Sequence, residues 1–271
     1  MSIHPSAIVS EGAQIHPDAD IGPLCVVGPH VSIGKGTQLI SHVSIQGHTS
    51  MGDDNTVHPF AVLGGAPQDL KYEGEDSKLV IGDNNQIREG ATLNLGTKAG
   101  NGETRVGDHC LMMAYSHVAH DCILGSRVIL ANSVGLAGHV ELGDHVIVGG
   151  LAGIHQFCRV GRNSFVAAGA MVAQDVVPFA IVQGDRAQHV GINSVGLRRS
   201  GWKQPQIAAV RMAFKRIFHP ENARLVALEQ TESTLAQESS EVAEMCAFIR
   251  SATRGVCRAR QALPNTEHYE A

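Results

Sequence analysis

The chain has 271 residues, of which 43% are hydrophobic and only 4% aromatic, and its formal net charge is −5 at pH 7. This length allows one large or two small domains, and the scarcity of aromatic side chains favours a core of small aliphatic residues. No apolar run approaches the ~18 residues that a membrane-spanning helix requires, and no charged-then-apolar leader opens the chain. The sequence therefore predicts a cytoplasmic protein without a membrane span.

Charged residues are unevenly distributed along the chain, and the cysteines show no regular pairing. Residues 1–196 carry 10 Lys/Arg against 18 Asp/Glu, whereas residues 197–271 carry 11 against 8, so the C-terminal part is the basic end. The six cysteines show no paired spacing and no CxxC zinc pattern. This predicts buried, reduced thiols instead of disulfides or a metal centre.

An aliphatic side chain recurs at every sixth position from residue 3 to 63, from 81 to 93 and from 106 to 172. We call these positions the beat. A fixed short period indicates a repeat architecture, and a period of six is typical of a parallel β-helix in which three hexads complete one coil. In the second half, the fourth residue after the beat is small, as at Cys110 and Ser116, so it fits inside a narrow coil. Gly107 and Gly143 directly follow the beat, where we expect the chain to bend.

Two polar segments interrupt the beat, and both are predicted to loop out of the solenoid. The segment PQDLKYEGEDSKLV lies between Leu63 and Ile81, and GTKAGNGETR lies between Leu93 and Val106. Loops on a rigid scaffold are where binding residues concentrate. The alternative is that both segments are tolerated insertions without a function.

The period changes near the C-terminus. From about Gln204 the apolar residues follow helical spacing in two stripes, the second ending before a C′ glycine at Gly255: Ile207, Val210, Phe214, Ile217 and Phe218, then Val242, Met245, Cys246 and Ile249. We expect a helical domain that covers the open end of the solenoid and prevents edge-to-edge aggregation. The predicted boundaries are residues 1–190 for the β-helix and 191–271 for the helical domain.

The sequence contains 15 histidines, and most of them stand at fixed places within the hexad. These are predicted to be turn residues stacked along one corner. His120 differs, because it stands two residues after the beat, is followed by Asp121 and has His117 three residues before it.

A histidine beside a carboxylate is a candidate general base, since imidazole titrates near the working pH and an acid can hold its tautomer. His120 could take the proton from an acceptor hydroxyl while that oxygen attacks an acyl carbonyl directly. A backbone N–H near Gly138 could hold the resulting oxyanion. The alternative, a packed histidine pair, accounts for the same spacing.

Segments along nearly the whole chain resemble those of one enzyme family in the same order: IGPLCVVGPHVSIG, PQDLKY, HVAHDC, LAGHV, HQFCRVG and SATRG. The family is UDP-N-acetylglucosamine O-acyltransferase, which catalyses the first step of lipid A biosynthesis. The resemblance implies an all-β solenoid, a left-handed parallel β-helix of hexapeptide repeats with a C-terminal α-helical domain, assembled as a homotrimer with active sites between subunits. It also implies that a 3-hydroxyacyl chain passes from acyl carrier protein to the 3-position of UDP-N-acetylglucosamine, with no metal or other cofactor.

The resemblance further implies residue roles. His120 would be the general base, Asp121 its orienting partner and Gly138 the oxyanion donor. The sugar nucleotide and the cleft around it would involve Asp69, Lys71, His117, His139, His155, Gln156, Asn193 and Arg199. The acyl chain would follow a groove past Val166, Ala167 and Ala168. Six basic residues could meet an acidic carrier protein or form a solvated helical face: Arg198, Arg199, Lys203, Arg211, Lys215 and Arg216.

The chain departs from the family pattern at Asn94-Leu95, Arg186 and Val195, where the family often has His-Arg, His and Glu. Asn94 suggests an alternative acceptor, the 3-amino group of a UDP-diamino sugar, which would make the product an amide.

Rival classes make different demands on the sequence. A trimeric zinc hydrolyase would hold Zn²⁺ with histidines of adjacent subunits, but no convincing ligand spacing is present. A related N-acyltransferase carries an N-terminal nucleotide-binding domain, which we do not expect because the hexads begin at Ile3. A non-catalytic solenoid predicts regular outward ladders of one residue type, whereas the outward positions are heterogeneous. No nucleic-acid-binding motif is present.

Overall fold

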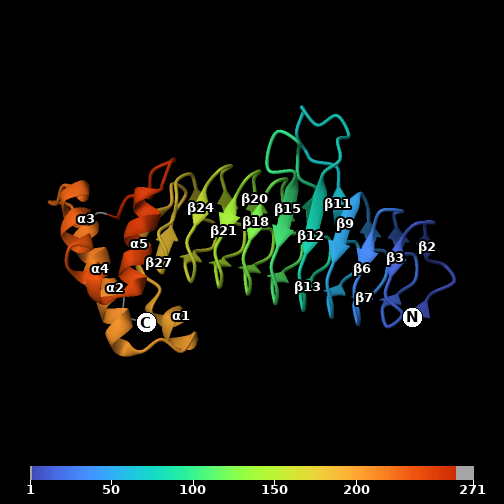
Figure 1. Ribbon diagram of the computed structural model, residues 1–271, viewed down its shortest axis with the longest axis horizontal. Coiled ribbons are helices and arrows are strands. Elements are labelled where there is room, and N and C mark those ends of the chain that lie inside the picture. The colour runs from blue at the N-terminus through green and yellow to red at the C-terminus, as the bar shows by residue number, and fades with distance from the viewer. Residues whose placement is uncertain (1, 261–271) are drawn as a thin grey trace.

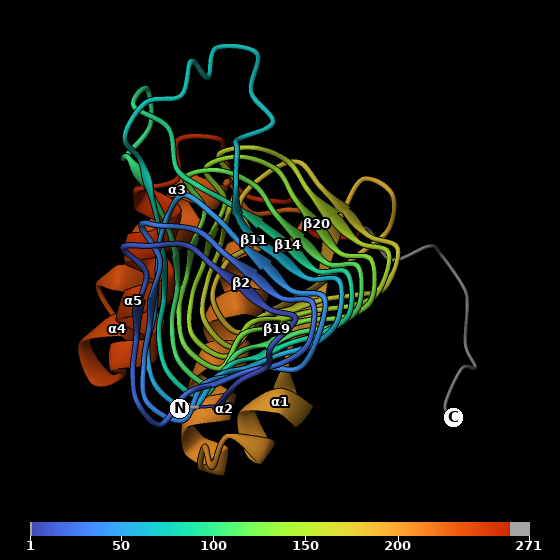
Figure 2. The ribbon, with the colours of Figure 1, turned by 90° about the vertical axis from the view of Figure 1, so that its right-hand side faces the viewer.

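Short parallel strands stack into a long rod, with helices gathered at one end (Figure 1). The computed structural model describes residues 2–260. Each coil passes through three strands, and each strand pairs with the strand one coil later, so that Ile3 lies beside Ile21. Viewed along the rod, the coils superpose as a triangular prism (Figure 2). The three hexads per coil predicted from the sequence are confirmed.

Three sheets form the walls of the prism. Sheet A consists of β1 (Ser2–Ile3), β4 (Asp20–Ile21), β7 (Gln38–Leu39), β10 (Thr56–Val57), β13 (Gln86–Ile87), β16 (Leu111–Met112), β19 (Ile129–Leu130), β22 (Ile147–Val148), β25 (Phe165–Val166), β27 (Ala180–Gln183) and β28 (Gln188–Ile192). Sheet B consists of β2 (Ile8–Val9), β5 (Val26–Val27), β8 (Ser44–Ile45), β11 (Val62–Gly65), β14 (Thr92–Asn94), β17 (His117–Val118), β20 (Gly135–Leu136), β23 (Gly153–Ile154) and β26 (Met171–Val172). Sheet C consists of β3 (Gln14–Ile15), β6 (Ser32–Ile33), β9 (His48–Met51), β12 (Lys78–Ile81), β15 (Glu103–Val106), β18 (Ile123–Leu124), β21 (Glu141–Leu142) and β24 (Arg159–Val160). We name each corner after the sheets whose strands it joins, so the turn after a sheet B strand is the B–C corner.

The core of the rod is filled from two positions in each hexad. The beat residue is the second residue of most strands, and its side chain points inward, as does the small residue four places later; Val118 and Cys122 are both fully buried. In successive coils, each inward side chain therefore packs on a side chain of similar size, which explains why small aliphatic residues suffice for the core. Both inward positions were predicted correctly.

The turns occupy the third place after the beat, where the backbone is often left-handed. The φ angles of His42, Asp121 and His139 there are 52°, 60° and 61°, so the predicted turn position is confirmed for the two histidines. Their predicted stacking along one corner is wrong, because His42 lies at the A–B corner and His139 at the B–C corner. His48 is different, because it lies in β9. The predicted bend at the glycine after the beat is wrong. Gly107 has no left-handed φ, and a Cβ on it would lie 2.7 Å from the backbone of Gly125 in the next coil, so this place needs glycine for close approach.

Both predicted loops are confirmed, and both leave the rod at the B–C corner in adjacent coils. Residues 66–77 connect β11 to β12 and form the long projecting loop of Figures 1 and 2, and residues 95–102 connect β14 to β15. The strands beyond them regain their register, since Ile81 pairs with Met51.

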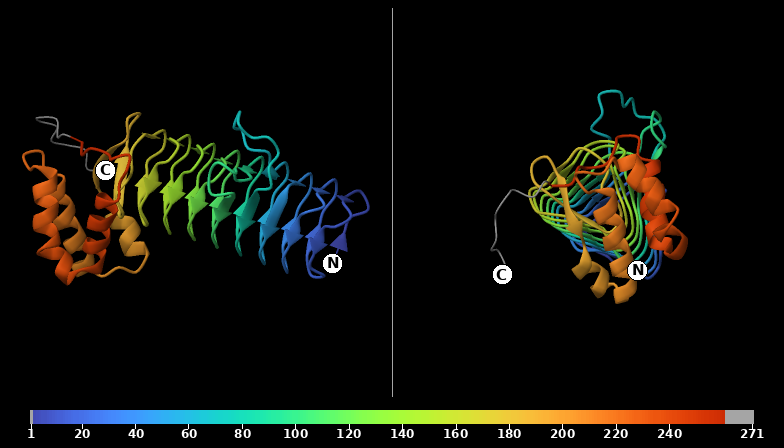
Figure 3. Two further views of the ribbon diagram at one scale, coloured as in Figure 1. Left: turned by 45° about the horizontal axis from the view of Figure 1, so that its top comes forward. Right: turned by 90° about the vertical axis from the view of Figure 1, so that its left-hand side faces the viewer.

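The C-terminal end is covered by an antiparallel hairpin of β27 and β28 and by helices (Figure 3). The helices are α1 (Ser194–Arg199), α2 (Gln204–Ile217), α3 (Arg224–Glu232), α4 (Leu235–Glu238) and α5 (Ser240–Arg250). The two predicted stripes lie on α2 and α5 and enter a second core with Phe179 and Leu197. The predicted helix end at Gly255 is wrong, because Ser251 caps α5.

The predicted division at residue 190 stays a prediction, since the two cores share the segment around the β27–β28 hairpin, and residues 261–271 lie outside the described residues. Among the described residues, no helix combines the length and apolar character needed to cross a bilayer.

Candidate active site

His120 and Asp121 form a hydrogen-bonded pair at the B–C corner after β17. The Nδ1 atom of His120 lies 2.8 Å from Oδ2 of Asp121. An ionised carboxylate can only accept, so Nδ1 carries the proton and Nε2 is left as an acceptor. The Asp121 side chain is fully buried, whereas 14% of the His120 side chain is exposed. The pair therefore has the arrangement of a base and its orienting acid.

The loop at residues 95–102 surrounds the Asp121 carboxylate. Thr97 donates its backbone N–H to Oδ1 at 3.0 Å and its hydroxyl to Oδ2 at 2.6 Å, and Asn101 donates its N–H to Oδ1 at 3.1 Å. Burial acts to raise the pKa of Asp121, but the hydrogen bonds from Thr97 and His120 outweigh it and lower the pKa below its usual value. The carboxylate is thus held ionised beside His120.

Gly138 lies against the His120 ring. A Cβ at Gly138 would lie 2.7 Å from Nε2 of His120, so any other residue would displace the imidazole. Within the described part of the chain, no backbone acceptor is recorded for the Gly138 N–H. This N–H is therefore available to an oxyanion bound in the groove that Gly138 and His120 line together.

A groove of about 670 Å³ runs along sheet B from His120 towards the C-terminal end. Its floor follows one outward row of paired residues, in which His117 is followed by Gly135, Gly153 and Met171 in successive coils. Gly135 and Gly153 were not predicted as site residues. They could have been found, because they are the only glycines in the place directly before the beat.

His117, His139, His155 and Gln156 lie around this groove. Nδ1 of His117 lies 2.8 Å from the Thr92 hydroxyl, and burial lowers the pKa of His117, with His120 adding to the effect. His139 packs edge-on against His120, and burial lowers its pKa although Asp121 opposes this. His155 and Gln156 are exposed and line the groove directly.

The predicted residues of the first loop are only partly at this site. Gln68 lines the groove, and the charge of Asp69 acts on His139. Lys71 instead lines a hollow of about 480 Å³ between the two loops, together with Glu75 and Lys98.

The predicted acyl-chain positions do not line the groove. Val166 is a beat residue of β25 and is fully buried in the solenoid core, so its side chain cannot contact a chain on the outer surface. Ala167 and Ala168 lie at the A–B corner and are not among the groove residues. The groove that leaves His120 is floored by Gly135 and Gly153 instead.

Asn193 and Arg199 lie on a different wall of the prism. Together with Val195 they line a pocket of about 630 Å³ over sheet A, under α1, to which His109 and His145 also contribute. Asn193 caps α1 by accepting the Gly196 N–H at 3.1 Å. Within one chain, these two predicted substrate residues are thus separated from His120.

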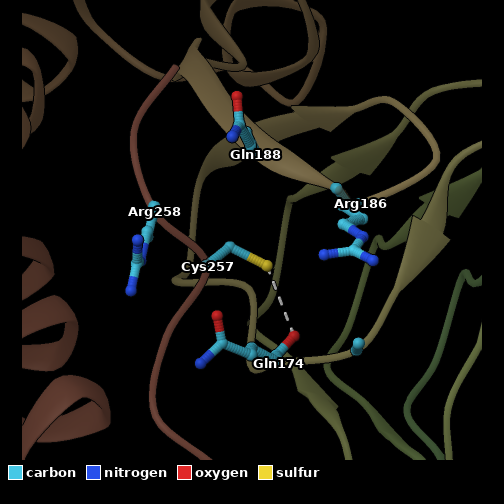
Figure 4. Close-up of a pocket in the computed structure, with 7 residues that line it drawn as sticks. Gln174, Arg186, Gln188, Cys257 and Arg258 are labelled. Carbon is cyan, nitrogen blue, oxygen red and sulfur yellow. Dashed lines mark hydrogen bonds between the residues drawn. The ribbon is translucent and has the colours of Figure 1, made fainter. Parts of the chain in front are cut away.

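Two of the departures from the family pattern, Arg186 and Asn94, lie in a turn and a strand near the groove, and the contacts of Asn94 explain its presence. Arg186 lies in the β27–β28 turn at the far end of the groove. It also borders a second hollow of about 570 Å³, together with Arg258 and Gln174, in which the Cys257 thiol donates to the Gln174 carbonyl (Figure 4).

Asn94 is buried and donates to the carbonyls of Gly65 and Ala66 at the root of the first loop. Asn94 therefore anchors this loop and does not line the groove.

His120, Asp121 and His139 each place one possible ligand atom within 4.8 Å of the others. Oδ2 of Asp121, however, already accepts the Thr97 hydroxyl and lies 2.8 Å from His120 Nδ1. A metal ion would have to displace at least one of these donors. The donor set therefore fits an acid–base pair better than the centre of a zinc hydrolyase.

Comparisons with known proteins agree with these features. A model of bacterial transferase hexapeptide repeats matches residues 103–138, and a model described as UDP N-acetylglucosamine O-acyltransferase, domain 2, matches residues 175–257. A relative from Anaeromyxobacter sp. (strain Fw109-5), named acyl-[acyl-carrier-protein]–UDP-N-acetylglucosamine O-acyltransferase, is 48% identical over 258 residues, which is 95% of this chain and 100% of the relative. The solved structure of LpxA from Acinetobacter baumannii has a TM-score of 0.92 at 42% identity and covers 94% of this chain and 99% of that one. The UDP-N-acetylglucosamine O-acyltransferase of Moraxella catarrhalis has a TM-score of 0.92 at 40% identity, covering 95% of this chain and 100% of that one.

A hexapeptide solenoid with a His–Asp pair on an outer groove defines a hexapeptide-repeat acyltransferase. The coils are those of a left-handed parallel β-helix with a helical C-terminal part, as predicted. The chain belongs to the UDP-N-acetylglucosamine O-acyltransferase family.

Proposed function

We propose that this protein transfers a 3-hydroxyacyl group from acyl carrier protein to the 3-hydroxyl of UDP-N-acetylglucosamine, the first step of lipid A biosynthesis. The observation that carries the proposal is the His120–Asp121 pair, which lies on the same groove as the free N–H of Gly138. The name of a relative supports the proposal, since it states an acyl transfer from acyl carrier protein to an oxygen of UDP-N-acetylglucosamine.

The chemistry follows from the geometry of the pair. Nε2 of His120 removes the proton from the 3-hydroxyl while that oxygen attacks the thioester carbonyl. The negative charge that develops on the carbonyl oxygen is met by the Gly138 N–H. Collapse of this intermediate breaks the C–S bond, and the departing thiolate takes the proton from the His120 imidazolium. Asp121 stabilises the imidazolium and stays ionised throughout, in keeping with its lowered pKa.

The acyl chain would lie over Gly135 and Gly153, where missing side chains open the groove, and Met171 would narrow it further along. Asp69, His117, His139, His155 and Gln156 would surround the sugar nucleotide at the other end, and Lys71 would approach it from the hollow between the two loops. No observation favours the amine acceptor, because the contacts of Asn94 are those of a loop anchor.

We further propose that the enzyme is a homotrimer with a shared active site. The A–B corner carries four exposed apolar residues, Leu24, Phe60, Tyr115 and Leu151, which are 53–70% exposed. If three copies meet at this corner, sheet B of one subunit faces sheet A of the next, as a closed ring requires. Such packing would bring Asn193 and Arg199 of one copy to the His120 groove of another. Arg199 then suits the diphosphate, because its planar fork matches phosphate oxygens.

The acyl carrier protein would dock on the basic surface of α1 and α2, where Arg198, Lys203 and Lys215 are exposed. We also propose that the protein acts in the cytoplasm. The six cysteines support this, because all of them are free thiols.

The variant His120→Ala tests the role of the base. Purified protein is given UDP-N-acetylglucosamine and a panel of 3-hydroxyacyl carrier proteins, and the products are read by mass spectrometry. We expect the wild type to form acylated sugar and His120→Ala to lose at least about 100-fold in rate while keeping the wild-type oligomeric state. Unchanged transfer would remove His120 from the mechanism, and a preference for a UDP-diamino sugar would revive the amide product.

Mixed oligomers test the shared site. His120→Ala and Arg199→Ala should each be inactive alone. Co-expressed in equal amounts, they should recover about a quarter of the wild-type activity, because a random ring then contains sites with both residues intact. No recovery in demonstrably mixed oligomers would mean that each chain uses its own His120 and Arg199.

A further inference from the structure

We infer that Thr97, which does not line the groove, is a positioning residue for the acyl transfer, because it holds Asp121 in the orientation that directs His120. The inference rests on the proposed function. Thr97 lies in the loop at residues 95–102, and no motif in the sequence marks it as functional.

The Asp121 carboxylate depends on this loop for its environment. Its side chain has no exposure to solvent. Apart from His120, the recorded donors to its two oxygens are the Thr97 N–H, the Thr97 hydroxyl and the Asn101 N–H. Thr97 therefore contacts both oxygens, one with its backbone and the other with its side chain, and so fixes the plane of the carboxylate.

The direction of the Thr97 hydroxyl is determined by its other partner. Oγ1 accepts the Gly100 N–H at 3.1 Å, so its single proton is free to point at Oδ2 of Asp121. At 2.6 Å this is a short, charge-assisted hydrogen bond. Oδ2 is the same oxygen that faces Nδ1 of His120, so the hydroxyl and the imidazole share one acceptor.

The loop that carries Thr97 is itself fastened on two sides. The Thr97 carbonyl accepts the N–H groups of Gly100 and Gly102, which closes the loop on itself. The Glu75 carboxylate accepts the Lys98 N–H at 3.2 Å and thereby ties the loop to the first one. Thr97 is thus placed by the fold and not by contact with substrate.

Loss of the Thr97 hydroxyl should change the strength of the electrostatic interaction between Asp121 and His120. With one donor fewer, Oδ2 interacts more strongly with a protonated His120, and the carboxylate gains freedom to turn. The other titratable groups that face His120 are His117 and His139, with Asp69 acting on His139. Because these groups stay in place, a change in the pH profile would report on the Thr97 contact.

The test compares Thr97→Val, which removes the hydroxyl at nearly constant shape, with Thr97→Ser, which keeps it. We expect Thr97→Val to lower kcat about tenfold with little change in KM, and to move the acid limb of the kcat profile to higher pH. Thr97→Ser should restore most of the rate. Thr37→Val is the matched control, because the buried Thr37 hydroxyl bonds to Gly52 and Asn55 far from the site; it should lower stability and leave the pH profile unchanged.

A second readout does not depend on activity. The Nδ1–H proton of His120 lies in the hydrogen bond to Asp121, so its NMR resonance should move in Thr97→Val and keep its position in Thr97→Ser. An unchanged resonance and an unchanged kcat in a folded Thr97→Val protein would overturn the inference. A wild type that forms no acylated sugar, while the resonance still moves, would instead count against the proposed function alone.

Discussion

At Gly100 the loop at 95–102 leaves no room for a side chain beside Asp121. A Cβ added there would lie 2.5 Å from Oδ2 of Asp121. The backbone of Gly100 is not left-handed, so alanine is allowed by conformation and excluded only by the carboxylate.

We predict that Gly100→Ala costs about 1–3 kcal/mol of stability, as overpacking does, and lowers kcat because Asp121 is pushed out of line. Steady-state kinetics and thermal unfolding measure the two effects. Gly102→Ala is the control in the same loop, since its Cβ would meet nothing within 4 Å; its strained φ should cost stability without loss of kcat. Equal kinetics for both variants would show that the carboxylate can move without consequence.

The sequence could predict the pair itself but not its support. His120 and Asp121 are neighbours in the chain, so a local pattern was enough to single them out. Thr97 and Gly100 reach Asp121 from another coil, and only the three-dimensional path of the inserted loop brings them there.

At the scale of elements, Arg162 joins the last coils of the solenoid to the helices. Its guanidinium makes a forked contact with Glu244 of α5 at 2.8–2.9 Å and lies over the rings of Phe179 and Trp202. Both charged side chains are about one third exposed, so solvent screens part of the attraction.

We predict that Arg162→Ala destabilises the helical part by about 1–2 kcal/mol, from the ion pair and the stacking together. Trp202 is the only tryptophan, so its fluorescence reports on this junction directly. Arg162→Lys keeps the charge and loses the fork, and should fall between Arg162→Ala and the wild type. A lysine variant as unstable as the alanine variant would assign the whole effect to planar geometry.

Elements differed in how well periodicity could find them. The stripes of α2 and α5 were visible because each is long enough for several turns of apolar repetition, whereas α1 and α4 are too short to show a period. The hexad period alone argues against the predicted role of Val166 in the acyl groove. Val166 is at the beat, and a residue at the beat points into the core and not towards an outer groove.

For the whole molecule, His189 links three parts of the chain. It is fully buried, its Nε2 accepts the Val177 N–H at 3.3 Å, and its Nδ1 donates to the Cys257 carbonyl at 2.9 Å. Burial lowers the pKa of His189 to about 4, and the charge of Arg224 adds to the effect.

The unfolded chain therefore binds a proton at His189 more readily than the folded protein does. We predict that this contribution to stability is complete above pH 6.5 and is lost as the pH falls towards 4, by roughly 3 kcal/mol in all. Chemical unfolding at a series of pH values measures it. Burial also lowers the pKa of His117 and of His139, so these two groups add to the loss of stability at low pH. The comparison must therefore be made with His189→Gln, whose free energy of unfolding should fall less steeply over this range. Parallel curves for the two proteins would assign the acid sensitivity to other groups.

The hexad period predicted the coil, the position of the core and the place of both loops, because each is a local property repeated along one axis. The hexad period could not show that the predicted site residues lie on two different walls of the prism. Whether Asn193 and Arg199 share a site with His120 depends on packing between copies of the chain.

Both inserted loops leave the same corner in consecutive coils, two coils and one coil before the turn that carries His120, and the strands beyond them recover their pairing. The rod thus tolerates added segments at this corner without any adjustment downstream. For an engineer, the corner is a grafting position: exchanging residues 67–74 for another sequence, with Glu75 kept to hold the loop that carries Thr97, is expected to redirect acceptor choice while the scaffold and the His120–Asp121 pair are inherited intact.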